Sequence, residues 1–258
     1  MGLRLAIDAR YPRESFPGIG RHLDNLLAAL PSVLEPGDQL LALTLDDRRL
    51  PAAVQRLAAP LRPRSLAEQL CLPAVARASR ADVLLSPYAF TALRAPCPRA
   101  LLVYDTIALD EHHGLRPAWR RVVARAWLRM AAGRSATLIT LSEAARGALA
   151  AAIGAGKHSV TVTGSAPDPA FRPQPPAAVA EARQALGLPR EYFVHLGANR
   201  PHKNVGALLR AFAASGLPAR GLGLALAGPG HEPRRHEPPG VLRLGRVEDS
   251  LLPGLLAG

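Results

Sequence analysis

The stretch HLGANRPHKNVGALLRAF, residues 195–212, changes its hydrophobic pattern halfway along. EYFVHLG (191–197) is apolar over the length of a buried strand, whereas VGALLRAFAA (205–214) spaces its apolar residues as one face of a helix does. The turn between them carries Lys203, one of two lysines in a chain rich in arginine. A strand, a short turn and a helix predict a βα unit, the building block of a parallel sheet.

The same alternation runs through the rest of the chain and predicts an α/β fold with parallel sheets. Strands are expected at 3–8, 39–45, 82–86, 99–105, 135–142, 159–164, 191–197, 221–228 and 241–245. Helices are expected at 19–30, 65–78 (kinked at Pro73), 117–133, 143–153, 178–186 and 205–214, with a last one from about 248.

A proline-rich stretch interrupts this rhythm at 163–178, TGSAPDPAFRPQPPAA, and is typical of an interdomain connection. It divides the chain into two expected Rossmann-like domains, 1–165 and 166–258. The second contains only about three expected strands, few for a doubly wound sheet. It is therefore expected to be incomplete, either a small appendage or a domain cut short.

The composition is strongly basic, with a formal net charge of +12. Such a charge attracts phosphates, anionic lipid or nucleic acid, although the scarcity of lysine indicates a genomic bias as a partial cause. Aromatic residues make up only 4%, which disfavours base stacking and hence a nucleic-acid partner. No apolar run approaches the ~20 residues of a bilayer span, and the N-terminus lacks a signal-peptide core. A cytoplasmic location is expected.

Lys203 is placed where an anion would bind. Ligands of open parallel sheets lie beyond the carboxyl ends of the strands, and Lys203 is expected in the first turn of the helix that follows such an end. A cation there is locally unfavourable by about 0.3–1 kcal/mol. A phosphate held between the lysine and the helix would reverse this, because each charge-assisted hydrogen bond contributes about 1.5–3 kcal/mol. The alternative is a solvated surface lysine.

Two further turns are candidates. Gly18 and Gly20, in PGIG after the first strand, allow backbone to approach a ligand at a helix N-terminus, but an ordinary tight turn explains them equally well. Asp105 ends the strand of VYDTIALDEHH (103–113) and could bind a hydroxyl or act as a base. Capping of a turn is an equally good explanation of Asp105.

The helix expected at 117–133 carries two stripes. Trp119, Val122, Val123, Ala126, Trp127 and Met130 recur at helical spacing. A basic stripe is formed by Arg116, Arg120, Arg121, Arg125 and Arg129. An anionic membrane surface would neutralise it, at about 1 kcal/mol per basic residue. The alternative is a solvated face.

Taken together in order, several segments resemble bacterial family 4 (group 1) glycosyltransferases. They are IDAR, PGIGRHLDNLL, VYDTIAL, TLSEAARGAL, YFVHLGANRPHKNVGALLRAF, LALAGPG and VLRLGRVEDSLLPGLLAG. The resemblance implies a GT-B fold, two Rossmann-like domains facing a cleft. It implies transfer of a hexosyl group, with mannosyl as one candidate, from a GDP- or UDP-sugar to a lipid-linked or polysaccharide acceptor at the inner membrane face. Retention at the anomeric carbon and no metal or cofactor are also implied.

The resemblance assigns roles to residues by position. Gly18 and Gly20 match a glycine loop near donor phosphate and acceptor, and Asp105 matches the aspartate of a His-Asp pair. Lys203 matches a lysine that holds the donor diphosphate. The remaining donor-side positions are Gly197, Arg200, His202, Gly245, Arg246 and Val247, the last three in a loop whose backbone meets the nucleobase.

Three positions depart from the family pattern. Tyr104 stands where the family has histidine, and His202 stands where it has arginine, for which Arg200 is a substitute. The sequence also stops before the family's EX7E segment. An inactive fragment or remnant is therefore an alternative, as is a Rossmann-type oxidoreductase, although PGIG is not the GxGxxG that a dinucleotide requires.

Overall fold

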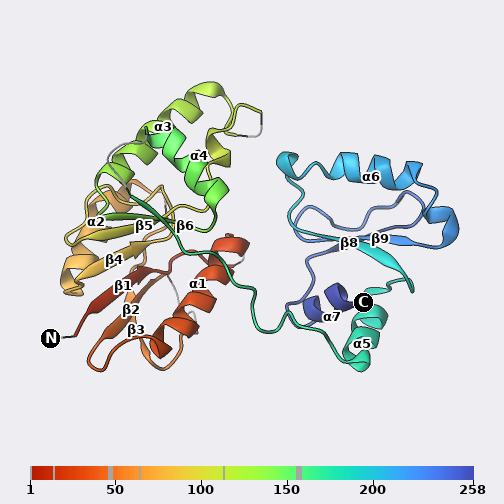
Figure 1. Cartoon of the computed structure of the whole chain (residues 1–258), viewed down its shortest axis with the longest axis horizontal. Helices are drawn as coiled ribbons and strands as arrows, with labels where there is room; N and C mark the ends of the chain where they lie inside the picture. Colours follow the sequence, from red (N-terminus) through yellow and green to blue (C-terminus); the bar gives the residue numbers. More distant parts are fainter. Residues whose placement is uncertain (1, 14, 46–48, 64, 113, 155–158) are drawn as a thin grey trace. The chain divides into compact units, whose positions relative to one another are not determined.

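The computed structural model describes residues 2–13, 15–45, 49–63, 65–112, 114–154 and 159–258. The chain divides into two compact units, Met1–Ala166 (unit 1) and Pro167–Gly258 (unit 2). Each unit contains one parallel sheet covered by helices (Figure 1).

Unit 1 contains a seven-stranded sheet in the order β3-β2-β1-β4-β5-β6-β7, and every neighbouring pair is parallel. Its strands are β1 (Arg4–Asp8), β2 (Gln39–Thr44), β3 (Val54–Ala58), β4 (Val83–Ser86), β5 (Arg99–Leu102), β6 (Thr137–Thr140) and β7 (Val160–Val162). The apolar runs of the central strands are buried on both faces, as a sheet covered by two helical layers requires.

Helices cover both faces of this sheet. On one face, α1 (Pro17–Ala29) packs through Leu23 and Leu27 against alternate residues of β1, β2, β4 and β5. On the other face lie α2 (Leu66–Ala78), α3 (Ala118–Gly133) and α4 (Glu143–Ile153) (Figure 1). From β1 the chain continues to β2 on one side of β1, whereas from β4 it continues to β5 on the opposite side of the sheet. The strand order therefore reverses between β1 and β4, the place where open α/β sheets bind ligands.

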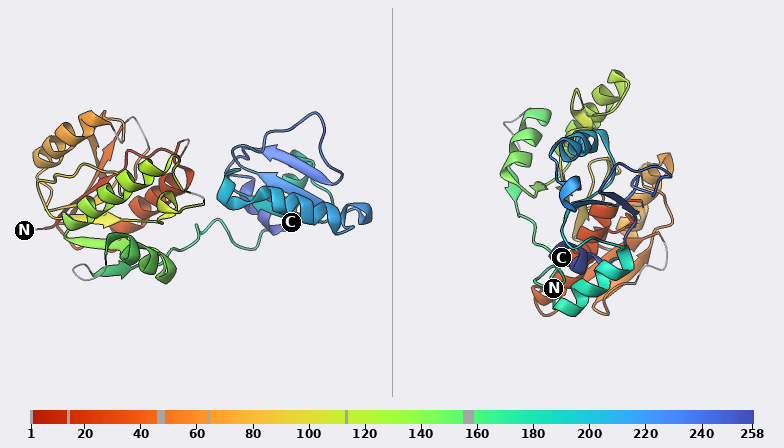
Figure 2. Two further views of the ribbon diagram at one scale, coloured as in Figure 1. Left: turned by 90° about the horizontal axis from the view of Figure 1, so that it is seen from above. Right: turned by 90° about the vertical axis from the view of Figure 1, so that its right-hand side faces the viewer.

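Unit 2 contains a three-stranded parallel sheet in the order β10-β9-β8. Its strands are β8 (Tyr192–Leu196), β9 (Gly223–Ala227) and β10 (Val241–Gly245). On one face, α6 (Val205–Ala214) packs through Val205 and Phe212 (Figure 2). On the other lie α5 (Pro176–Leu186) and α7 (Leu252–Ala257).

The expected α/β class, with parallel sheets in both units, is confirmed, and each expected strand and helix overlaps an observed one. Three details differ. The strand β3 was missed, α2 continues through Pro73, and α7 begins at Leu252 instead of near 248. β3 shows why: only Val54 is buried, and the strand lies at the sheet edge, where pairing with β2 and not an apolar pattern defines it.

Candidate functional site

The loops at the carboxyl edge of unit 2 are joined by backbone hydrogen bonds. The backbone N–H of Asn199, in the loop after β8, donates a hydrogen bond to Pro229 O in the loop after β9 (2.9 Å). The loop after β9 also donates from Gly228 N to Gly245 O (2.6 Å) and accepts from Gly245 N at His231 O (2.8 Å). The predicted segments after β8 and β10 are therefore held together through a third segment, residues 228–231, to which the sequence analysis assigned no site residue.

Glycine is required where these loops meet. Gly228 has φ +120°, and a Cβ there would collide with the carbonyl group of Gly197. Gly245 has φ +61°, a backbone conformation that residues with a Cβ rarely adopt. Of the predicted glycines, Gly245 thus has a local structural reason for its identity, and so does Gly197, whose φ is +156°.

Lys203 lies just before α6 and not in its first turn, which corrects the expected position. Pro201–Lys203 form a 3-10 turn, Asn204 adopts the left-handed conformation at φ 47°, and α6 begins at Val205. The cause is the Asn-Val junction: Asn tolerates this conformation, so the chain turns once more before the helix starts. Lys203 and Arg200 are exposed at this edge, while His202 is half-buried.

The two predicted side chains in the loop after β10 differ in exposure. Arg246 is exposed, whereas Val247 is 9% exposed and packs in the core with Leu252 and Leu255. Val247 can therefore offer a ligand its backbone but not its side chain.

Two histidines under the same edge were missed by sequence reasoning. The rings of His195 and His231 meet edge to face with centroids 5.4 Å apart. Burial, and secondarily the neighbouring His195 and Arg243, lower the pKa of His231. The ion pair of Arg243 with Glu237 (3.0 Å) lies beside them. The apolar strand around His195 is a sequence signal that this histidine is partly buried. Nothing in the sequence indicates that His231 packs against it.

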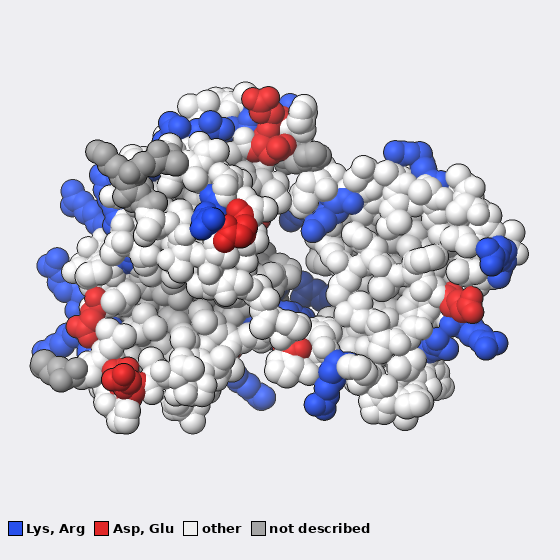
Figure 3. Space-filling view, in the orientation of Figure 1, with Lys and Arg blue, Asp and Glu red and all other residues white. Residues whose placement is uncertain are grey.

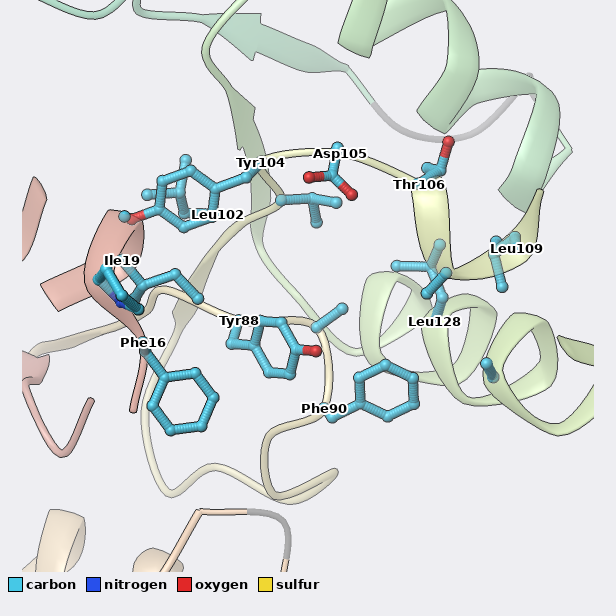
Figure 4. A pocket seen from close by; sticks show the side chains of 16 residues that line it. Phe16, Ile19, Tyr88, Phe90, Leu102, Tyr104, Asp105, Thr106, Leu109 and Leu128 are labelled. Atoms are coloured by element: carbon cyan, nitrogen blue, oxygen red, sulfur yellow. The ribbon is translucent and has the colours of Figure 1, made fainter. Parts of the chain in front are cut away.

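Unit 1 has a pocket of about 360 Å³ at the carboxyl edge of its sheet, at the reversal of strand order (Figure 4). Both Gly18 and Asp105 line it, so two residues from separate predicted turns lie at one site. Gly20 does not. A Cβ on Gly20 would approach Arg13 N to 2.8 Å, which indicates that Gly20 allows α1 to pack closely on the preceding loop.

Asp105 lies at the edge of this pocket, on the segment that follows β5 (Figure 4). Its Oδ1 accepts a hydrogen bond from Ile107 N at 3.0 Å, so the carboxylate also holds the turn Ile107–Leu109. The neighbouring Tyr104 packs its ring edge to face against His22, with centroids 5.4 Å apart. Burial raises the pKa of Tyr104 well above its ordinary value, so this phenol is neutral at physiological pH.

In α3, several of the apolar side chains expected at helical spacing lie on the exposed face of the helix. Its inner face is made of Ala124, Leu128, Ala131 and Ala132. Much of the expected apolar stripe is on the outer face, where Trp119 is 60%, Val122 69% and Val123 54% exposed, but Trp127 is half-buried and packs against the core. Several arginines bind backbone carbonyls, as Arg129 does at Ala152 O (3.0 Å).

The formal net charge of the chain is +12. On the face drawn in Figure 3, the described Lys and Arg side chains lie around both units and do not form one stripe. None of the helices in the described part of the chain combines the length and apolar character needed to cross a membrane.

No family model matches the sequence, and no curated protein matches it either. Solved structures do match. Sucrose-phosphate synthase from Thermosynechococcus elongatus has a TM-score of 0.73 at 14% identity, over 100% of this chain and 73% of that one. WaaG, a glycosyltransferase involved in lipopolysaccharide biosynthesis, has a TM-score of 0.68 at 16% identity, over 97% and 72%.

A third match is Anabaena HepE in complex with UDP and glucose, with a TM-score of 0.64 at 18% identity, over 100% of this chain and 72% of HepE. At such identities the likeness shows the fold alone. The chain has an α/β fold of the GT-B type.

Proposed function

We propose that the protein is a glycosyltransferase that uses a nucleotide-diphosphate sugar. The observation that carries the proposal is the carboxyl edge of unit 2, where three interlocked loops expose Arg200, Lys203 and Arg246. Cations and backbone N–H groups fixed at such an edge suit a diphosphate. The GT-B fold is compatible with this activity, and HepE, a protein of similar fold, was crystallised with UDP-glucose.

In the proposed reaction, the bond between the anomeric carbon and the donor's diphosphate oxygen breaks, and its electron pair leaves with the nucleoside diphosphate. A hydroxyl oxygen of the acceptor forms the new bond to the same face of the anomeric carbon, so configuration is retained. The hydroxyl proton passes to the departing diphosphate. Lys203 stabilises the negative charge that gathers on this group as the bond breaks.

Each predicted donor-side residue has a distinct proposed role. Lys203 binds the diphosphate and Arg200 supplements it, in place of His202, whose half-buried ring orients the turn. The backbone of Gly245, Arg246 and Val247 meets the nucleobase, uracil or guanine. Gly197 leaves room for a phosphate at the end of β8.

On the acceptor side, Asp105 accepts a hydrogen bond from the reacting hydroxyl, and Gly18 forms part of the wall beside it. Tyr104 is a neutral phenol at a position where the family has histidine, and Asp105 is the carboxylate among the residues that line the pocket. The acceptor is lipid-linked or a polysaccharide.

We also propose a peripheral contact with anionic membrane on the cytoplasmic side, made by the outer face of α3. Its exposed Trp119, Val122 and Val123 would enter the lipid interface, while nearby arginines meet the headgroups. The guanidinium of Arg120 lies 5.5 Å from the centre of the Trp119 ring, which pairs a cation with an aromatic ring at this surface. The other contributors are Arg116, Arg121, Arg125 and Arg129.

The activity is tested by incubating the full chain with UDP-glucose or GDP-mannose and a lipid extract, and measuring nucleoside diphosphate release and glycosylated product by mass spectrometry. Release that depends on one donor and is abolished in Lys203→Ala supports the proposal. If neither donor is consumed and neither nucleotide binds, the proposal is wrong.

A further inference from the structure

The pocket of unit 1 has walls made mostly of carbon. Three aromatic side chains line it, those of Phe16, Tyr88 and Phe90. Aliphatic side chains line it as well: Leu102 lies next to Tyr104, whereas Leu109 and Leu128 lie at the end near Phe90 (Figure 4). These residues come from the loop before α1, the segment after β4, β5 itself, the turn after it and α3, so the apolar character is built from five separate parts of the chain.

Few side chains bring polar groups to the pocket, and one of these groups, the hydroxyl of Tyr88, points toward Phe90 (Figure 4). Asp105 and Thr106 lie together at one edge, on the segment that follows β5 (Figure 4). The hydroxyl of Tyr104 points toward Ile19 and away from Phe90 and Leu128 (Figure 4). A ligand inside the pocket therefore meets carbon over most of its surface, together with the single hydroxyl of Tyr88 and a carboxylate at one end.

This distribution decides between two classes of acceptor. A sugar ring would bring several hydroxyl groups into the apolar part, and a buried hydroxyl without a hydrogen-bond partner is unfavourable. Burial of an apolar molecule in the pocket is favourable in free energy, and its single hydroxyl group can stay at the rim. The volume of about 360 Å³ has room for about twelve groups of water size, at about 30 Å³ for each water.

We propose that the acceptor is an alcohol whose hydroxyl is carried on an apolar body of about a dozen non-hydrogen atoms, bicyclic or branched, seated between Phe90 and Leu128 with its hydroxyl on Asp105. This inference depends on the proposed function, which supplies the sugar. It narrows the acceptor to a molecule whose reacting end is apolar and is not a saccharide.

The experiment measures binding of two probe alcohols, 2-naphthol and geraniol, and of maltose as the saccharide, by isothermal titration with the full chain. Ala108→Phe fills the pocket from its half-buried rim, and Ala126→Phe adds the same ring on the outer face of α3 as the matched control. Circular dichroism establishes that each variant is folded. Asp105→Asn leaves the walls intact.

Saturable binding of either probe alcohol is expected, weakened at least about tenfold by Ala108→Phe, a loss of about 1.4 kcal/mol, and unchanged by Ala126→Phe. Asp105→Asn should retain most of the binding, because the apolar walls supply it. Binding of maltose but of neither alcohol, or equal weakening by both phenylalanine variants, overturns the inference.

A parallel titration with UDP and GDP keeps the two proposals separate. Nucleotide binding without alcohol binding leaves the glycosyltransferase proposal intact and rejects the apolar acceptor. Alcohol binding without binding of either nucleotide keeps the apolar site and rejects the transferase. If Ala108→Phe unfolds, displacement of bound naphthol by geraniol in the unmodified chain decides whether one saturable site binds both.

Discussion

Asn199 is fixed to Gly230 on the neighbouring loop: its side-chain amide donates to Gly230 O at 3.3 Å, and a Cβ on Gly230 would lie 2.9 Å from Asn199 Cβ. This contact joins the turn that carries Lys203 to the end of β9. We expect Gly230→Ala to displace the turn, since Gly230 also has φ +84°. UDP binding should weaken while the far-ultraviolet circular dichroism stays unchanged.

The matched control for Gly230→Ala is Gly216→Ala. Gly216 has a similar φ of +71° but open space around its Cβ position. Both variants therefore carry the same backbone strain, of order 1 kcal/mol, and only Gly230→Ala presses on Asn199. Equal nucleotide affinity in the two variants would show that the contact does not position the turn.

Arg10 is fully buried between two carboxylates in unit 1. Its guanidinium binds Asp8 through Nε (2.7 Å) and Nη2 (2.8 Å), and reaches Glu68 Oε1 at 2.5 Å. Burial alone would lower the pKa of Arg10, but the hydrogen bonds and charges of Asp8 and Glu68 raise it. Arg10→Met removes the guanidinium from two buried carboxylates and is expected to destabilise the chain by about 3–5 kcal/mol.

Urea denaturation checks the prediction for Arg10, with Arg125→Met, at an exposed position on α3, as the control. If both variants unfold at the same urea concentration as the unmodified chain, the buried network does not contribute as stated. This network was not singled out from the sequence, because residues 8, 10 and 68 are brought together only when α2 folds over the sheet.

His231 predicts a pH dependence of stability. Burial lowers its pKa in the folded chain below its ordinary 6.5, so below pH 6.5 the unfolded chain binds more protons than the folded chain. The contribution of this group is complete above pH 6.5 and is lost as the pH falls through the folded pKa. The melting temperature should differ less between pH 7.5 and pH 5 in His231→Asn than in the unmodified chain, because these two pH values bracket the window in which His231 titrates.

Thermal unfolding of His231→Asn and of His236→Asn, an exposed position on the same loop, separates this effect from that of the other histidines. A pH dependence that is unchanged in His231→Asn and reduced in His236→Asn would contradict the assignment.

The outer face of α3 predicts membrane binding. The double variant Val122→Ser, Val123→Ser should abolish cosedimentation with phosphatidylserine vesicles, because it removes apolar side chains that are 69% and 54% exposed. Arg125→Gln should weaken binding by about fivefold, from about 1 kcal/mol per basic residue. Leu66→Ser, at an apolar position on α2 that is even more exposed (89%), is the control and should bind normally. Equal binding by all variants would exclude this face.

The sequence predicted most elements of the fold because its apolar periodicity is strong in buried strands such as LLAL (40–43). It missed β3, whose pairing and not its pattern makes it a strand. It named Asp105 and Gly18 but could not show that they share a pocket with Phe90 and Leu128, since that proximity arises from packing of distant segments. It placed Lys203 inside the helix because local spacing does not reveal the left-handed Asn204.

Lys203 is central to this account, and nucleotide binding tests it most directly. Isothermal titration with UDP and GDP should give a saturable affinity for at least one of them that falls about tenfold or more in Lys203→Ala, because one charge-assisted hydrogen bond is worth about 1.5–3 kcal/mol. Arg220→Ala removes an exposed cation just before β9, at the opposite end of the sheet, and should leave the affinity unchanged. Equal affinity in Lys203→Ala and the unmodified chain would contradict the account.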